Sequence, residues 1–482
     1  MEQRVDTVHL REQFLEQMTE LLRRHRLSLE AEDERGGGDG GPPREHVEDL
    51  AYRRELDVLQ RELERLHPAD VAYILEALPL DERLIVWNLV KTERDGEILL
   101  EVSDAVRESL IASMDEQELV AATEQLDTDE IADLAPDLPR EVIQDVFKSL
   151  SIEEREQLRA AMSYDEDTVG ALMDFDMVEV REDVTLEVVL RYLRRLDELP
   201  DHTNQLFVVD RNAHLQGLLP VNRILVSSAD VLVADVMIRD FVQFNPREQA
   251  QDAAAAFERY DLVTAPVVDD DGRLVGRMTI DAVVDYIREA QQSEMLSAGG
   301  LKEDEDLFAS VWKSVKNRWT WLAVNLVTAF IASRVIGAFE NSIAQLVALA
   351  ALMPIVAGIG GNSGNQTITM IVRALAVGQI TRDNARKLLM KEIGVSGVNG
   401  LIWGAVVGLF AFLIYHNWQL GLVMTAAMIL NLLLAAVMGV SVPMLLEKLG
   451  RDPAVGSSVL ITAITDSGGF FIFLGLATIF LV

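Results

Sequence analysis

The sequence predicts a multidomain membrane protein: an all-α superhelical N-terminal domain, a pair of repeated α/β modules, a connecting helix and a transmembrane domain of five helices. Three observations predict this fold class. The chain of 482 residues has a net charge of −35, yet 35 of its 43 Lys and Arg and 72 of its 78 Asp and Glu precede Trp319. Residues 206–225 align without a gap to residues 265–284, which indicates duplicated modules. The last third of the chain consists of hydrophobic runs long enough to cross a bilayer.

The composition excludes several classes of function. The chain has no cysteine, so disulfides and thiolate metal sites are excluded. An acidic soluble portion disfavours a nucleic-acid partner, which would want a basic face. The acidic side chains either meet metal cations or simply keep a large domain soluble, and composition leaves both open. The first residues, MEQRVDTVHLREQF, are charged and unlike a signal peptide, so we expect the soluble portion to be cytoplasmic.

The N-terminal part of the chain is predicted to be helical. Residues 1–45 form an extension, a helix followed by a flexible spacer at Gly36–Pro43. Residues 46–163 have apolar positions three and four apart, as in an acidic domain built of short helices. His67–Pro79 and Asp127–Pro139 form a weak repeat that indicates stacked helical hairpins. This domain is either a scaffold or a binder of metal ions.

Residues 164–285 are predicted to fold as two tandem modules, about 164–228 and 229–285. Each reads strand, turn, strand, helix, as in LFVVDRNAHLQGLLPVNRIL and APVVDDDGRLVGRMTIDAVV, and Met173 matches Met237 upstream of them. Residues 286–318 are predicted to form a connecting amphipathic helix that pauses at Gly299–Gly300. Its basic end should lie at the membrane surface.

Residues 319–482 are predicted to contain five spans. Their expected bounds are Trp319–Phe339, Ile343–Ile359, Ile393–His416, Leu420–Leu446 and Ala454–Val482. The basic residues cluster before the first span, between the second and third, and between the fourth and fifth. By the positive-inside rule the N-terminus lies in the cytoplasm and the C-terminus on the opposite side.

An aspartate, Asp466, lies within the fifth predicted span. A charged side chain at bilayer depth is costly and by default marks an ion or proton path, although a structural hydrogen-bonding role is the alternative. Thr462 lies one helical turn before it on the same face, and Thr465 is its neighbour. These three side chains provide oxygen atoms, which Mg²⁺ prefers as ligands.

The second predicted span ends in the segment Met353–Gln366, MPIVAGIGGNSGNQ, which we expect to break the helix. Pro354 removes a backbone donor, and Gly360 and Gly361 would let bare carbonyl groups and Asn362 approach a cavity. Close helix packing is the alternative for the glycines, and it is the expectation for Gly358. One aspartate in each chain is little charge for a divalent ion, so a homodimer that joins two copies is predicted.

The chain resembles the MgtE family of magnesium transporters, with a pair of CBS domains as the tandem modules. The resemblance covers roughly residues 46–482 and rests on YDEDTVGALM (Tyr164–Met173), PIVAGIGGNSGNQ (Pro354–Gln366), IVRAL (Ile371–Leu375) with KEIGV (Lys391–Val395), and DPAV with TAITDSGGF (within Asp452–Phe470). It implies a homodimer with a central magnesium pore in the inner membrane. It also implies that Asp466 is the pore aspartate, faced by Gly360, Gly361 and Asn362. Acidic cytosolic domains of that family bind Mg²⁺ and close the pore.

The chain departs from the family's regulatory patterns. The nucleotide motif of CBS domains, Gly-x-x-Thr-x-x-Asp, is broken, since Ala282 replaces the aspartate after Gly276 and Thr279, and the first copy has Pro220 and Arg223. We therefore do not expect tight nucleotide binding. The candidate regulatory ligands for Mg²⁺ are Asp129, Asp133, Asp281, Asp285, Glu289, Glu294 and Asp452. Ala282 and Ser293 offer no carboxylate, so closure by Mg²⁺ is expected to be weaker than in the family or differently wired.

The predicted function is passive, channel-like transport of Mg²⁺ into the cytoplasm, gated by Mg²⁺ on the acidic domains. Membrane lipid, Mg²⁺ and a second copy of the chain are the expected partners. One alternative is a magnesium sensor that does not transport, but a pure sensor has no need of a broken helix. The other is an intramembrane aspartyl enzyme, which requires two carboxylates that share a proton.

Overall fold

The computed structural model describes residues 14–21, 23, 44–90, 92–196, 198–299, 301, 306–376, 379–380, 382–451, 453 and 456–482. It divides into two compact units. The first unit comprises residues 1–289 and 306–309, and the second comprises residues 290–305 and 310–482.

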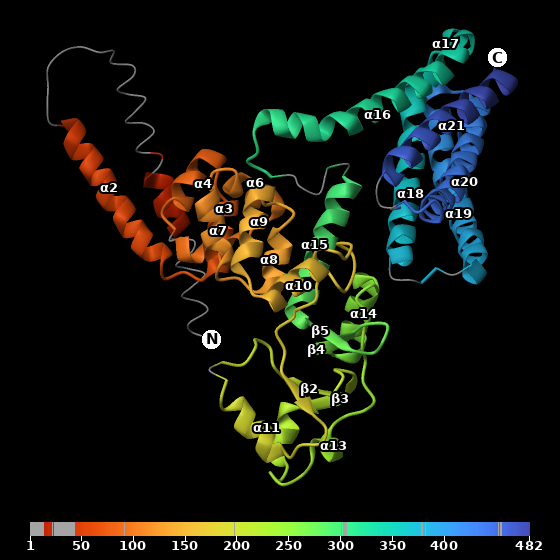
Figure 1. Ribbon diagram of the computed structural model, residues 1–482. Helices are drawn as coiled ribbons and strands as arrows, with labels where there is room; N and C mark the ends of the chain where they lie inside the picture. The colour runs from red at the N-terminus through yellow and green to blue at the C-terminus, as the bar shows by residue number, and fades with distance from the viewer. Residues whose placement is uncertain are drawn as a thin grey trace. The chain divides into compact units, whose positions relative to one another are not determined.

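The N-terminal domain of the first unit is all-helical, as predicted. It comprises α2 (Arg44–Leu63), α3 (Pro68–Glu76), α4 (Leu80–Trp87), η1 (Thr92–Arg94), α5 (Asp95–Glu101), α6 (Asp104–Ile111), α7 (Glu116–Thr123), α8 (Thr128–Leu134), α9 (Arg140–Ser149) and α10 (Ile152–Ala161). Asp115, Asp127 and Ser151 each begin a helix with a capping box, which satisfies two backbone donors at once. Short polar caps therefore separate helices that share one apolar core (Figure 1).

The N-terminal extension contributes to this core. Residues 14–21 are helical, and Phe14 and Met18 are buried in the same cluster as Leu59 and Leu63 of α2. The predicted flexible spacer at Gly36–Pro43 lies outside the described residues.

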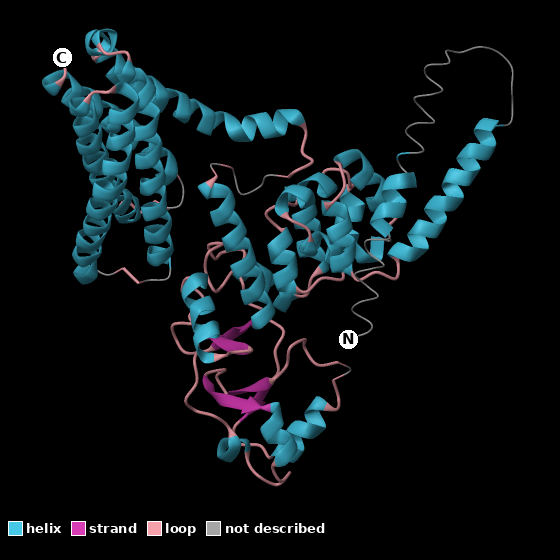
Figure 2. Ribbon diagram, turned by 180° about the vertical axis from the view of Figure 1, so that it is seen from behind, coloured by secondary structure: helices cyan, strands magenta, loops and turns pink. Residues whose placement is uncertain are grey.

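The tandem modules contain two sheets (Figure 2). In the first, β1 (Glu179–Arg181) pairs parallel with β2 (Gln205–Val209), which pairs antiparallel with β3 (Leu215–Pro220). In the second, β4 (Thr264–Val268) pairs antiparallel with β5 (Leu274–Thr279). Both hairpins have a register shift at the same point of the repeat, after Val208 and after Val267. The predicted strand–turn–strand–helix repeat is thus confirmed, and the structure adds a register shift that recurs in both copies.

Helices cover these sheets. They are α11 (Leu186–Leu193), α12 (Val221–Val226), α13 (Val233–Val236) and α14 (Ala250–Tyr260). The two predicted equivalents, Met173 and Met237, are both buried, and each packs on the strand of the other module. A Cβ built on Gly217 would lie 2.9 Å from Sδ of Met237, and one on Gly276 would overlap Met173. The second module therefore packs against the segment that precedes β1, and the first module packs against the segment that precedes β4.

The connecting helix differs from its predicted bounds. Helix α15 runs over Ile280–Ala298 and begins directly after β5, and the next helix begins only at Val311. The predicted pause at Gly299–Gly300 therefore separates two helices, the second of which begins later than predicted. The structure also extends the second of them, α16 (Val311–Ala338), directly from its amphipathic start into the first predicted span.

Four helices of the second unit, within the residues that the structure describes, are long and apolar enough to cross a membrane. They are α16, α19 (Arg382–Tyr415), α20 (Trp418–Lys448) and α21 (Ser457–Phe480). A short helix, α17 (Glu340–Gln345), precedes α18 (Ala348–Ala376), which has 29 residues. Helix α18 is not one of these four, and glycine and amide side chains occupy its middle. Figure 1 shows α18 to α21 side by side in one bundle.

The expected break in the second span is wrong. Helix α18 continues through Gly360, Gly361 and Asn362 as regular α-helix, with Pro354 inside its N-terminal part. The reason is packing. A Cβ on Gly364 would lie 2.6 Å from Cγ1 of Ile461, so glycine lets α18 approach α21 closely. Tertiary contact thereby outweighs the low helix propensity of the segment.

The expectation that Gly358 serves close packing is also wrong. Among the residues that the structure describes, none lies within 4 Å of a Cβ built on Gly358. Close packing instead involves glycines elsewhere in the bundle, such as Gly408 of α19, where a Cβ would lie 2.5 Å from the carbonyl oxygen of Gly421 in α20. Leu352, Met424 and Phe473 form part of the apolar core between α18, α20 and α21.

Candidate ion pathway in the helical bundle

Asp466 lies in the middle of α21, where its side chain is half-buried. Its carboxylate makes no hydrogen bond and no ion pair with any residue that the structure describes. A carboxylate inside a membrane helix without a protein partner is available to a cation.

The two predicted threonines lie on different faces. Thr462 is exposed, and its hydroxyl donates to the carbonyl oxygen of Ser458, 2.8 Å away. Thr465 is fully buried and donates to the carbonyl oxygen of Ile461 at 2.8 Å. Because both protons are used within the helix, each hydroxyl oxygen keeps only its role as an acceptor. Thr462 therefore shares the accessible face of α21 with Asp466, while Thr465 lies at the contact with α18.

Helix α18 meets this part of α21. Gly361 is buried, and a Cβ on it would lie 3.7 Å from the hydroxyl oxygen of Thr465. Asn362, the next residue, is exposed. We use the name polar seam for this set of residues: Gly360, Gly361, Asn362, Thr462, Thr465 and Asp466. The structure brings Gly361 and Thr465 together, and it places Asn362 and Asp466 on the two helices that flank this contact.

Asn431 of α20 is a buried polar residue that the sequence prediction missed. It is fully buried, and its Nδ2 donates to the carbonyl oxygen of Val356 in α18 at 2.9 Å. Its Oδ1 has no partner among the described residues. A Cβ on Gly469 would lie 2.7 Å from Nδ2, and one on Gly360 would overlap it. Asn431 thus fits between two helices whose facing residues are glycines, and its hydrogen bond ties α20 to α18.

A polar contact also joins α18 to α21, nearer the start of α21. The hydroxyl of Ser458 donates to Oδ1 of Asn365 over 3.0 Å. The side chain of Glu392 in α19 is also buried, and its Oε1 lies 3.3 Å from Nζ of Lys391. A lone Asn or Glu in an apolar segment is the sequence signal that could have identified these residues.

The acids of the first unit influence one another. Burial raises the pKa of Asp129 to about 8, and the charge of Asp174 adds to this effect. Loss of hydration raises the pKa of Asp133 to about 6 although part of its side chain reaches solvent, and Glu289 adds to the rise while Arg107 opposes it. Burial also raises the pKa of Glu289. The acid beside Asp133 is therefore Glu289, whereas the acid beside Asp129 is Asp174.

The remaining predicted regulatory ligands are dispersed. Oδ1 of Asp281 lies 3.6 Å from Nε2 of His202, and Asp285 pairs with Arg288 at 3.4 Å. Glu294 is exposed, and Asp452 lies outside the described residues. Among the described residues no three His, Asp or Glu side chains converge as a metal site. The regulatory ligand set therefore stays a prediction.

Comparison with known protein families gives three matches. Residues 353–476 match the profile of MgtE, described as a divalent cation transporter. Residues 66–167 match the MgtE intracellular N domain, and residues 233–289 match a CBS domain.

Two relatives agree with these matches. The magnesium transporter MgtE of Thermus thermophilus is 30% identical over 444 residues, covering 90% of this chain and 98% of its own. MgtE of Bacillus subtilis is 25% identical and covers 87% and 93%, respectively. A crystal structure of the cytosolic domain of the Mg²⁺ channel MgtE in complex with ATP is 28% identical, with a TM-score of 0.45. It covers 50% of this chain and 98% of that one.

Proposed function

The chain belongs to the MgtE family of magnesium transporters, and we propose that it carries Mg²⁺ passively through a channel-like path along the polar seam. The observation that supports this path is Asp466, an unpaired carboxylate on α21 beside the polar part of α18. Mg²⁺ gives up its water reluctantly, so a path with one carboxylate and several neutral oxygen atoms suits the partly hydrated ion.

We infer that α18 is the fifth span. Its 29 residues exceed the roughly 20 that a span requires. Its polar middle contacts protein, through Asn431 and Thr465, which makes glycines and amides tolerable at membrane depth. With five spans and the basic residues in the loops, the N-terminus lies in the cytoplasm and the C-terminus on the far side of the inner membrane.

A homodimer completes the path in this proposal. One chain supplies one aspartate to the polar seam. A two-fold axis would bring two copies of Asp466 to a divalent ion. The exposed Thr462 and Asn362 would then face the second copy across the path.

Regulation is proposed to involve neighbouring acids of the first unit. Asp133 and Glu289 repel each other when both are charged, and Mg²⁺ would relieve that repulsion. Because Ala282 and Ser293 supply no carboxylate, we expect this closure to need more Mg²⁺ than in the family pattern.

The test of passive, inward transport is Mg²⁺ uptake into liposomes at different membrane potentials, without ATP. An inside-negative potential drives Mg²⁺ inward by about 2.3 kcal/mol per charge per 100 mV. Uptake should therefore rise steeply as the interior becomes negative. Uptake that ignores the potential would contradict a channel-like path. No uptake at low cytosolic-side Mg²⁺ would favour the sensor instead.

A further inference from the structure

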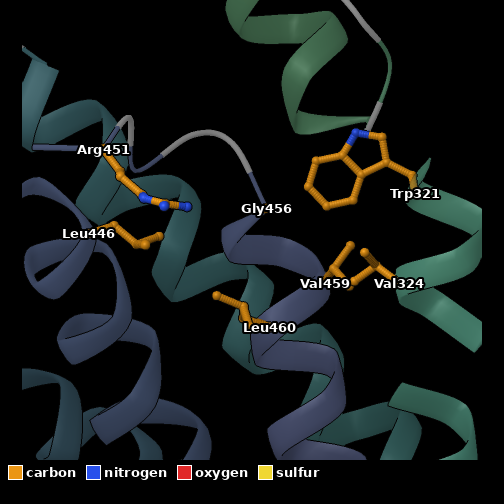
Figure 3. Close-up of a pocket in the computed structure, with 7 residues that line it drawn as sticks. All are labelled: Trp321, Val324, Leu446, Arg451, Gly456, Val459 and Leu460. Atoms are coloured by element: carbon orange, nitrogen blue, oxygen red, sulfur yellow. The ribbon is translucent and has the colours of Figure 1, made fainter. Parts of the chain in front are cut away.

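A cavity of about 440 Å³ opens between the membrane helices. It lies between the start of α16, the end of α20 and the start of α21 (Figure 3). Its lining residues are Trp321, Val324, Leu446, Arg451, Gly456, Val459 and Leu460. Ligand sites in proteins commonly enclose about 300–1,000 Å³, so the size suits a ligand or part of one.

The lining is apolar apart from one guanidinium group. Within the described part of this lining, four aliphatic side chains and an indole form the walls, and Arg451 is the one charged residue. Figure 3 shows the side chain of Arg451 extending toward Gly456, with Trp321 on the opposite side. Arg451 is exposed, and its guanidinium group forms no ion pair or hydrogen bond with the described part of the chain. A ligand for this cavity is therefore apolar along most of its length and anionic at one end.

The wall formed by Trp321 is fixed by the backbone at the start of α21. Gly456 has a φ of +79°, a conformation that favours glycine. A Cβ at this position would lie 2.9 Å from the indole ring of Trp321. The ring thus rests directly against the backbone of Gly456, at the end of the helices. Tryptophan is enriched at this level of membrane proteins, where its ring lies among the lipid headgroups.

The charged residues next to the lining along these helices are mostly basic, with Glu447 as an acid at the end of α20. Lys448 is the last residue of α20, and Arg451 follows in the loop to α21. Lys316 and Arg318 lie within the two turns of α16 that precede Trp321. Basic residues between helices on the cytoplasmic side of membrane proteins recognise anionic lipid headgroups.

We propose that this cavity binds an anionic phospholipid, with its phosphate on Arg451 and an acyl chain along Val324, Val459 and Leu460. The inference depends on α16, α20 and α21 being membrane spans, and it is independent of the ion path. A free phosphate would use one exposed, solvent-screened guanidinium and leave the apolar walls uncovered. A neutral lipid would fill the walls and leave Arg451 without an anion.

The test uses the full chain in nanodiscs that contain either brominated phosphatidylglycerol or brominated phosphatidylcholine, since bromine quenches tryptophan fluorescence on contact. The Trp321→Phe variant isolates the contribution of Trp321 by difference. We expect the anionic lipid to quench Trp321 about fivefold more effectively than the neutral lipid, the preference that one basic residue near an anionic lipid gives. Arg451→Gln should abolish this preference. The control is Arg334→Gln, which removes an exposed charge from α16 ten residues beyond Val324 and should preserve the preference.

Three outcomes would overturn the proposal. Equal quenching by both lipids would show that the cavity does not select a charged headgroup. Quenching by neither lipid would show that protein, such as a second copy, covers the cavity. Loss of the preference on addition of inorganic phosphate would show that Arg451 recognises a bare anion. Native mass spectrometry of the unaltered chain and of Arg451→Gln gives a second measurement, in which the variant should retain less phosphatidylglycerol, and this keeps the test valid if Trp321→Phe fails to fold.

Discussion

The guanidinium group of Arg83 donates two hydrogen bonds to the carboxylate of Asp306, from Nη1 at 2.9 Å and from Nη2 at 3.2 Å. Arg83 is fully buried in the N-terminal domain, where its Nε donates to the carbonyl oxygen of Leu75 at 2.9 Å. Asp306 lies in the segment that directly precedes α16. This ion pair therefore holds residues 306–309, the segment before α16, against the N-terminal domain.

We predict that Asp306→Asn releases this segment. The substitution leaves the charge of buried Arg83 without its counter-ion, which costs about 2 kcal/mol. The segment 306–309 should therefore detach from the N-terminal domain roughly thirtyfold more often. Hydrogen exchange of the peptide that contains residues 306–309 should accelerate accordingly. The control is Asp145→Asn, which breaks an exposed pair with Lys148 and should change exchange in its own helix little. Unchanged exchange at residues 306–309 would show that Arg83 does not hold them.

The raised pKa of Asp129 predicts a pH dependence of stability. Its folded value of about 8 lies above the unfolded value of roughly 3.9. Between these two values the folded state binds one proton more than the unfolded state. The free energy of unfolding therefore falls as the pH rises from roughly 4 to about 8. Without divalent cations, Asp129→Asn should raise the melting temperature of the first unit by roughly 2–4 °C at pH 8. Calorimetry of the full chain at pH 8 and pH 5 tests this, since the gain should shrink at the lower pH. A gain that grows at pH 5 would contradict the assigned shift.

The fit of Asn431 between two glycines predicts a difference between neighbouring positions on α18. Gly360→Ala places a methyl group on Asn431, and overpacking of this kind costs about 1–3 kcal/mol. Gly358→Ala is the matched control, because its methyl group would meet no described residue within 4 Å. Thermal unfolding in detergent should show a loss for Gly360→Ala and none for Gly358→Ala. Equal behaviour of the two variants would mean that α18 and α20 do not approach as closely as described.

The sequence predicted the features that depend on local pattern. The repeat of residues 206–225 and 265–284 predicted both hairpins because strand alternation and turn residues are local signals. The hydrophobic run around Asp466 likewise predicted that it lies within a helix of spanning length.

The sequence did not predict the features that depend on contacts between residues far apart along the chain. The glycine-rich part of α18 remains helical because Asn431 and Ile461, on two other helices, fill the space beside it. Likewise, nothing near Asp306 in the sequence indicates that its partner is Arg83. Such contacts join residues far apart along the chain, and one sequence carries no signal for them.

The central claim, that Mg²⁺ passes Asp466, is tested most directly by Mg²⁺ uptake into liposomes that contain the full chain or its Asp466→Asn variant at equal density. Asparagine keeps the size of the side chain and removes its charge. The matched control is Glu447→Gln, which removes an exposed acid from the end of α20. We expect the parent and the control to transport Mg²⁺ and Asp466→Asn to fall to the rate of protein-free vesicles. Uptake by Asp466→Asn at the parent rate would contradict the claim, because the path would then not depend on this carboxylate.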